Sequence, residues 1–172
     1  LQYTDDNGNK LNYRAVKGEN AFSTINSAID TKGREGLIIK IGAGTYSEAI
    51  ASLAINGLKF YGNYADICPN VDTADPFTKD LNPLRDPSQE TVIAGKWQWK
   101  KDTYNITING CTVSGAGQFS VYNSSAYSGD IHIKNNIFKG TSVSSPIQAG
   151  AGYTNSMYIT FNRFEGVGYL LS

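Results

Sequence analysis

The sequence IHIKNNIFKG at residues 131–140 is one of four copies of a short phrase that decides the fold. In each copy two runs of alternating apolar residues flank an Asn-containing dipeptide, and the last residue is Gly. The other copies are LAINGLKFYG at 53–62, ITINGCTVSG at 106–115 and MYITFNRFEG at 157–166. The last three copies follow each other at intervals of 25 and 26 residues. A fixed interval of this size indicates stacked supersecondary units.

The alternation within each phrase predicts two short strands. Apolar residues two positions apart, such as Ile131 and Ile133 before the dipeptide and Phe138 after it, place one face of a strand in a core. Asn and Gly tolerate positive φ and so permit a sharp bend between the strands. A single unit of this kind cannot bury its apolar face, whereas stacked copies can.

The interval leaves room for a third strand in each repeat. The sequence predicts it at TVIA (91–94), FSVY (119–122), PIQ (146–148) and YLL (169–171). Three short strands in about 25 residues predict an all-β fold, a parallel β-helix. Asn136 and Asn162 occupy equivalent inward positions, where polar side chains are costly unless hydrogen-bonded. We therefore expect stacked Asn side chains that bond to each other and to the backbone.

We predict one domain over residues 1–172. Turn residues and periodicity predict its parts. The sequence DDNGN predicts a hairpin, and an amphipathic run with Phe22 on its apolar face predicts a helix. A proline-rich segment predicts a surface loop. The expected parts are a hairpin (1–18), a capping helix (20–31), the first coil (37–62), an inserted loop (63–90) and further coils (91–172). Asn20 or Ser23 is expected to cap the helix, which should end at Lys32-Gly33.

Composition excludes two classes of partner. The chain has 15 basic and 15 acidic residues and no basic run, which argues against electrostatic binding of nucleic acid. No apolar run is long enough for a membrane span. Abundant Tyr and Gly with only 17% charged residues suit a secreted, β-rich protein.

Two chemical questions stay open in the sequence. Cys111 is expected to be a buried thiol, and a Cys68–Cys111 disulfide that pins the inserted loop is the alternative. The series Asp5, Asn7 and Asn9 alternates oxygen ligands as calcium loops do, although the remainder of such a loop is missing. The sequence therefore predicts a plain turn and no cofactor, with calcium as the alternative.

The segments FSTINSAI (22–29) and LIIKIGAGTYSE (37–48) resemble the opening of the pectate-lyase-like superfamily. The phrase NNIFKG at 135–140 is also typical of that superfamily. The resemblance covers the chain from about residue 20 and implies a right-handed parallel β-helix with an N-terminal capping helix. Because the superfamily contains lyases, hydrolases, esterases and non-catalytic surface proteins, the resemblance is specific for fold and weak for activity.

Aromatic residues are the candidates for carbohydrate binding. Trp97 and Trp99 flank Gln98, so alternation puts both on one face. If that face is outward, they form a platform for sugar rings; the alternative is that they pack under the inserted loop. Three further candidates are expected at turns or outward positions: Tyr122, Gln148 and Tyr153.

Catalytic residues are not evident. The resemblance implies that acid–base machinery lies on or beside the sheet formed by the third strand. The outward positions assigned to that strand carry no acid or base: Val92, Ala94, Ser120, Tyr122, Pro146 and Gln148. The remaining candidates are isolated in the sequence: Asp130, His132, Lys134, Arg163 and Glu165.

Together these observations predict a secreted or cell-surface β-helix that acts on or binds an extracellular polysaccharide. As an enzyme it would be a lyase, esterase or hydrolase; the alternative is a non-catalytic adhesin or structural module. Residues 169–172 begin another coil without a cap. Since uncapped coils expose strand edges, we expect further coils or another chain to cover that end.

Overall fold

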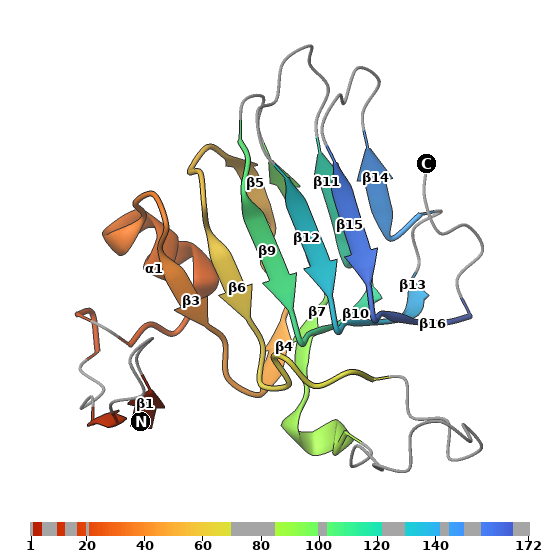
Figure 1. Ribbon diagram of the computed structural model, residues 1–172, viewed down its shortest axis with the longest axis horizontal. Coiled ribbons are helices and arrows are strands. Elements are labelled where there is room, and N and C mark those ends of the chain that lie inside the picture. The colour runs from red at the N-terminus through yellow and green to blue at the C-terminus, as the bar shows by residue number, and fades with distance from the viewer. Residues whose placement is uncertain are drawn as a thin grey trace.

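The computed structural model describes residues 2–4, 10–12, 17–19, 21–69, 85–99, 103–121, 130–141, 145–149 and 156–166. These residues form three parallel sheets, a small antiparallel pair of strands and one short α-helix (Figure 1). The fold is therefore all-β with parallel sheets, as the alternation predicted.

The first sheet has the strand order β15-β12-β9-β6-β3. Its strands are β3 (Ile38–Lys40), β6 (Lys59–Tyr61), β9 (Ile106–Asn109), β12 (Ile131–Lys134) and β15 (Met157–Thr160). The second sheet has the order β16-β13-β10-β7-β4. Its strands are β4 (Gly44–Tyr46), β7 (Thr91–Ile93), β10 (Thr112–Gly115), β13 (Ile137–Thr141) and β16 (Arg163–Glu165). The third sheet, in the order β14-β11-β8-β5, contains β5 (Ile50–Leu53), β8 (Lys96–Trp99), β11 (Gln118–Val121) and β14 (Ile147–Ala149).

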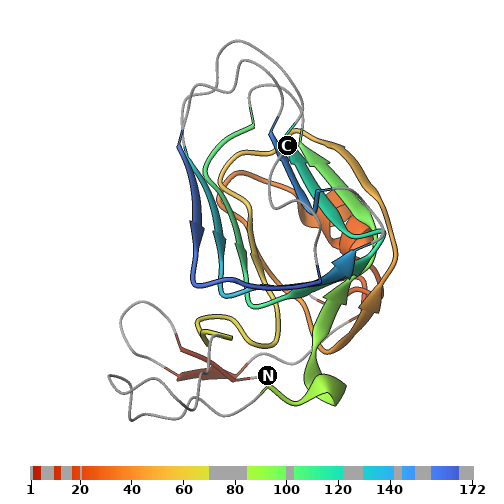
Figure 2. The same cartoon turned by 90° about the vertical axis from the view of Figure 1, so that its right-hand side faces the viewer.

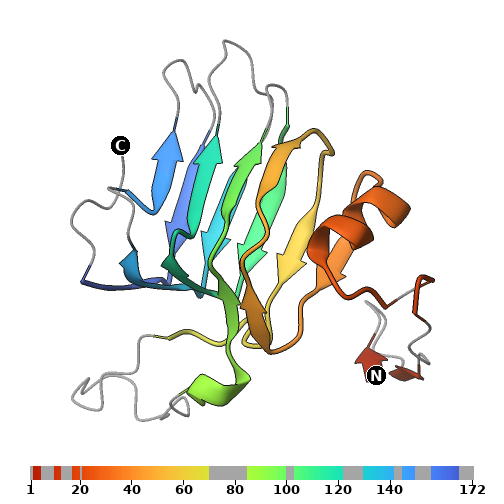
Figure 3. The same cartoon turned by 180° about the vertical axis from the view of Figure 1, so that it is seen from behind.

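From β3 onward, consecutive strands of the chain join the first, second and third sheet in turn. Each of the first four rounds adds one strand to each of these sheets, and the next round returns to the first sheet beside its previous strand. In the described residues the fifth round adds β15 and β16. Viewed from the end, the sheets surround a common interior (Figure 2). Seen from behind, later rounds follow earlier ones away from the helix (Figure 3). Ile131 pairs with both Ile106 and Met157, which confirms the register of the last three copies of the phrase.

The first copy of the phrase was aligned wrongly. Lys59 pairs with Thr107, so residues 58–62 correspond to 106–110 rather than to 111–115. The second round therefore begins at β6, inside the predicted first coil (37–62). The inserted loop stands where the three following rounds have a tight corner that contains Asn, and it hides the interval that would have revealed the register.

The strand at residues 91–94 was assigned to the wrong sheet. Val92 pairs with Thr112, so β7 belongs to the second sheet, and β8 supplies the third-sheet strand of that round. The reason is the position of the loop, which separates the first strand of the round from the second. The strands predicted at 119–122 and 146–148 do lie in the third sheet, as β11 and β14, so only the strand directly after the loop was assigned to the wrong sheet.

Asn side chains close the corners between the first and second sheets. Asn136 Oδ1 accepts a hydrogen bond from the Cys111 N–H (2.9 Å), and Asn162 Oδ1 accepts one from the Asn136 N–H (2.8 Å). The two side-chain amides donate to the carbonyls of Ile108 (3.1 Å) and Ile133 (2.7 Å). The predicted Asn stack is confirmed, and it satisfies backbone groups that would otherwise be buried without partners.

The helix α1 (Ile25–Lys32) starts later than predicted. The Thr24 side chain accepts from the Ser27 N–H and caps the helix, so the predicted start at residue 20 and the caps Asn20 and Ser23 are wrong. The helix ends before Gly33, as expected. Its buried residues belong to the same apolar cluster as the strands: Ile25, Ala28 and Ile29.

Glu48, the last residue of the GTYSE segment, holds the start of α1. Its carboxylate accepts hydrogen bonds from the N–H groups of Ile25 (2.7 Å) and Asn26 (2.9 Å). These N–H groups have no partner within the helix, and the positive end of the helix dipole favours the charge. The segment therefore attaches α1 to the first round of sheet strands through a charged contact.

Glu48→Ala should lower the free energy of unfolding by about 2 kcal/mol, because two charge-assisted hydrogen bonds to the helix terminus are lost. Urea denaturation followed by circular dichroism measures the change. The exposed Glu35 provides the control, since its replacement by Ala should change stability by less than about 0.5 kcal/mol. Equal effects of the two substitutions would contradict the capping role.

The N-terminal hairpin is confirmed. β1 (Gln2–Thr4) and β2 (Lys10–Asn12) pair antiparallel, with Tyr3 opposite Leu11. The turn at residues 5–9 lies outside the described residues, and so does the calcium alternative at Asp5, Asn7 and Asn9.

Candidate binding groove on the second sheet

The two tryptophans lie in the interior. Alternation does place Trp97 and Trp99 on one face, but each side chain is only 1% exposed. The Trp97 ring packs between Phe60 (4.9 Å between ring centres) and Phe119 (5.6 Å). The platform prediction is therefore wrong for both residues, and so is packing under the loop. β8 occupies a regular third-sheet position, where alternate side chains point inward.

The other predicted carbohydrate ligands form no site among the described residues. Gln148 in β14 is half-buried, and its Oε1 accepts from the Ser120 hydroxyl at 3.3 Å. Tyr122 and Tyr153 lie outside the described residues. His132 is exposed as predicted and stacks on Tyr158, with ring centres 4.8 Å apart and planes 8° from parallel.

The inserted loop is anchored on the corner between the first and second sheets. We call residues 63–69 and 85–90 the loop base. Asp66 donates its N–H to Asn109 Oδ1 (3.0 Å), and its carboxylate accepts from Asn109 Nδ2 (2.8 Å) and Lys134 Nζ (3.1 Å). The Asn109 hydrogen bond, with Lys134 beside it, lowers the pKa of Asp66. Gly110 is needed beneath the loop base, because a Cβ there would lie 2.1 Å from the Ala65 nitrogen.

Arg85 joins the two halves of the loop base to the sheets. Its side chain is 4% exposed. Nη2 donates to the carbonyl of Ile67 (2.9 Å) and to that of Asn135, and the guanidinium lies 5.0 Å from the Tyr64 ring centre. Burial lowers the pKa of Arg85, and the carboxylate of Glu90 opposes that shift.

Glu90 is the buried counter-charge of Arg85. One of its carboxylate oxygens accepts a hydrogen bond from the Thr112 hydroxyl (2.7 Å) and lies 3.7 Å from Arg85 Nη1. Arg85 Nε and Nη1 have no hydrogen-bond acceptor among the described residues. Thr112 belongs to β10, so this pair fastens the loop base to the outer face of the second sheet.

A groove of about 320 Å³ lies between the loop base and the second sheet. Its floor comes from four neighbouring strands: Val92 in β7, Thr112 and Ser114 in β10, Ile137 and Lys139 in β13, and Arg163 and Glu165 in β16. The loop base forms the wall with Cys68, Pro69, Arg85, Pro87 and Glu90. Hydroxyl, acidic and basic groups therefore share one concave surface.

The far end of the groove carries a small ion-pair cluster. Glu165 lies between Arg163 (2.7 Å) and Lys139 (3.8 Å), each contacting a different carboxylate oxygen. Glu90 at the other end is engaged by Thr112 and Arg85. Since both carboxylates already have partners, the arrangement suits ligand binding better than proton transfer.

The sequence contained part of the signal for this groove. Phe138 and Phe164 point inward and stack with ring centres 4.8 Å apart, so alternation places Lys139, Arg163 and Glu165 outward on adjacent strands. The sequence predicted the acid–base site on the third strand and left Arg163 and Glu165 as isolated candidates. Arg163 and Glu165, isolated in the sequence, are brought together here with Lys139.

Both cysteines are free thiols, so the disulfide alternative is wrong. Cys111 is buried at an inward corner position, as expected, and burial raises its pKa to about 12. Cys68 is half-buried and lines the groove.

A thiol reagent should therefore distinguish the two cysteines. At pH 8 the native protein should release one equivalent of thionitrobenzoate from Ellman's reagent, through Cys68, because only thiolates react and Cys111 is buried. Unfolding in guanidinium should raise the count to two. Cys68→Ser is the control and should leave the native protein unreactive. Two fast-reacting thiols in the native protein would contradict the placement of Cys111.

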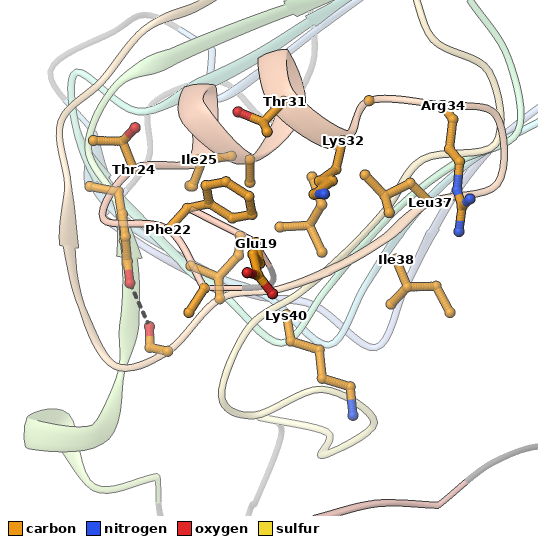
Figure 4. Close-up of a pocket in the computed structure, with 17 residues that line it drawn as sticks. Glu19, Phe22, Thr24, Ile25, Thr31, Lys32, Arg34, Leu37, Ile38 and Lys40 are labelled. Atoms are coloured by element: carbon orange, nitrogen blue, oxygen red, sulfur yellow. Dashed lines mark hydrogen bonds between the residues drawn. The ribbon is translucent and has the colours of Figure 1, made fainter. Parts of the chain in front are cut away.

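A larger hollow of about 790 Å³ lies at the helix end of the sheets, between α1 and the edge strand β3. Phe22, Ile25 and Leu37 form its apolar part, with Lys32 and Lys40 at its margin (Figure 4). Its lining has one acid, Glu19, three bases and the hydroxyl groups of Thr24, Thr31 and Tyr46, whereas the groove on the second sheet crosses four neighbouring strands and contains two acids.

The described residues contain neither a candidate membrane-spanning helix nor a candidate metal site. No helix there is sufficiently long and apolar to cross a membrane. Within the same ranges, no group of three or more His, Cys, Asp and Glu side chains is arranged to hold a metal ion. Comparison of the chain with family models, curated proteins and solved structures found no match.

Proposed function

We propose that this chain is a right-handed parallel β-helix of the pectate-lyase-like class and binds an extracellular polysaccharide in the groove on its second sheet. The observation that carries this proposal is that four neighbouring strands, one from each of four successive rounds, line a single groove. The protein then works outside the cell or at its surface.

The rotation of the chain through three sheets supports the solenoid. Parallel strands joined through a crossover follow a right-handed path in almost all proteins, which supports that hand. The buried side chains of α1, which cluster with those of the edge strands β3 and β5, support its role as the N-terminal cap.

The direction of the groove supports a linear ligand. Neighbouring strands are about 4.8 Å apart, so a groove that crosses four of them extends roughly 14 Å along the stack. A chain of several sugar units fits such a surface better than a compact metabolite does. A solenoid can also repeat its surface along the same axis as the polymer.

The groups in the groove also suit sugars. The Ser114 hydroxyl can donate and accept hydrogen bonds. In the ion-pair cluster, Lys139 and Arg163 are charged hydrogen-bond donors and Glu165 is a charged acceptor. Apolar contacts come from Val92 and Ile137 on the floor. Mixed surfaces of this kind bind ligands with many hydroxyl groups and an apolar ring face.

The partial burial of apolar residues in the last strands supports the proposal that this end of the stack is covered. Met157, Ile159 and Phe164 pack against the core but are only partly buried. Because unpaired strand edges and apolar surface attract further strands, we propose that further coils or another chain lie over β14, β15 and β16.

A non-catalytic adhesin or structural module is the second candidate, ahead of a lyase, esterase or hydrolase. It is favoured by the state of the groove carboxylates, because Glu90 and Glu165 are each engaged by neighbouring groups. A hydrolase of the common type needs two carboxylates that are free to serve as acid and base or nucleophile.

Affinity electrophoresis through gels containing plant and algal polyuronates or neutral glycans, with Ca²⁺, tests the proposal. Wild-type protein should be retarded in at least one glycan gel. Ser114→Phe, which fills the groove, should migrate freely, while the control His132→Phe on the first sheet should be retarded like wild type. Ultraviolet and reducing-sugar assays on the same glycans detect cleavage. Free migration of wild type in every gel with no product would overturn the proposal, and product formation would replace the adhesin version with the enzyme version.

A further inference from the structure

The corner between the first and second sheets repeats one unusual backbone conformation. Gly110, Asn135 and Phe161 follow paired strand ends in successive rounds, and their φ values are +77°, +55° and +55°. Gly adopts this left-handed conformation freely and Asn tolerates it, but it is rare for an aromatic residue. Phe161 is therefore strained where its two counterparts are not.

Packing within the described chain does not compensate for this strain. The counterpart Asn135 is buried and donates its side-chain amide to Asn109 Oδ1 at 2.9 Å. In contrast, the Phe161 side chain is 66% exposed, more than any other large apolar residue that the structure describes. Backbone strain that the fold does not need concentrates at functional positions.

Phe161 lies at the rim of the groove on the second sheet. Its carbonyl oxygen is 3.9 Å from the Cys68 thiol, and Cys68 is part of the groove wall. Two residues further along the chain, Arg163 is part of the groove floor. An exposed aromatic residue thus contacts the groove wall through its carbonyl group and lies two residues before a charged residue of the groove floor.

We propose that Phe161 is the aromatic platform on which one sugar ring of the bound polysaccharide stacks. This inference rests on the proposed function of the groove. The C–H face of a pyranose ring is apolar and packs on an aromatic face, while its hydroxyl groups reach Arg163 and Ser114. The strained backbone keeps the ring out of the core and presents it to the ligand.

The test combines affinity with stability. Phe161→Asn installs the residue that the preceding round has at this corner, so the melting temperature should rise by a few degrees. The same variant should bind the glycan that retains wild type about tenfold more weakly, or worse, because the stacking surface is gone. Phe161→Trp keeps an aromatic face and should keep the affinity. Ile38→Ala, at an exposed apolar residue of β3, should change neither binding nor the ranking of glycans.

The outcomes separate this inference from the proposed function. Wild-type affinity in Phe161→Asn, with binding still abolished by Ser114→Phe, would overturn the platform and leave the groove. A fall in both melting temperature and affinity in Phe161→Asn would show a structural role and overturn the inference. If wild type binds no glycan, the proposed function fails and the platform fails with it.

Discussion

Trp97→Ala is expected to lower the free energy of unfolding by about 3–5 kcal/mol, the cost of removing a large aromatic side chain from a core. Trp97 is 1% exposed and packs against Phe60 of the first sheet and Phe119 of its own sheet. The substitution therefore leaves a cavity at the centre of the stack, bordered by strands of three rounds. Urea denaturation followed by tryptophan fluorescence, through the remaining Trp99, measures the change.

Two variants make this result specific. Trp97→Phe should cost less, because an aromatic ring remains and the indole N–H, which has no partner among the described residues, is removed. Gln98→Ala changes a half-buried neighbour on the opposite face of β8 and should cost about 0.5 kcal/mol or less. If Trp97→Ala kept full stability and lost glycan binding, the sugar platform would lie at Trp97 and the interior placement would be wrong.

Arg85→Ala is expected to destabilise the protein by about 3–5 kcal/mol, because it leaves the buried Glu90 carboxylate without its counter-charge. The substitution also removes the hydrogen bonds to the carbonyls of Ile67 and Asn135. The loop base would lose part of its attachment and keep the Thr112–Glu90 hydrogen bond, so glycan binding in the groove should weaken as well. Urea denaturation gives the free energy, and affinity electrophoresis gives the binding.

The charge argument has its own controls. The double variant Arg85→Met with Glu90→Leu removes both buried charges and should recover much of the lost stability. Arg163→Ala breaks an exposed pair with Glu165 and should cost less than about 1 kcal/mol. A loss below about 1 kcal/mol in Arg85→Ala would mean that the Glu90 charge remains solvated without Arg85.

The repeated phrase made most of the architecture predictable. Alternation around Asn136 and Asn162 specified inward faces, and burying a polar amide required the hydrogen bonds that the structure contains. Both effects are local, because strand periodicity and corner chemistry depend on residues near each other in the sequence. The register of the last three rounds followed directly from the fixed interval.

The inserted loop limited prediction in the second round. It replaces the tight corner between β6 and β7, so no phrase indicated which sheets β7 and β8 would join. Trp97 and Trp99 were consequently given no strand in a predicted sheet, so their shared face could be read as an outward sugar platform or as packing under the loop. Only the pairing of β8 with β5 and β11 shows that they belong to the core.

The groove depended still more on tertiary structure. Its wall is held by contacts of Asp66 with Asn109 and of Arg85 with Asn135, between residues 43 and 50 positions apart. Alternation alone could place Lys139, Arg163 and Glu165 on one outer face, but it contains no information on which loop covers that face.

The sequence by itself determined the parallel strands, the inward residues, the Asn corners and the hairpin, because each depends on short-range periodicity or turn chemistry. Only the tertiary structure decided where the loop base docks, which sheet receives the tryptophans and how Arg85 meets Glu90. The physical reason is that stacking brings equivalent positions of successive rounds within one strand spacing, about 4.8 Å. An insertion within a round changes those neighbours without altering the local pattern of any strand.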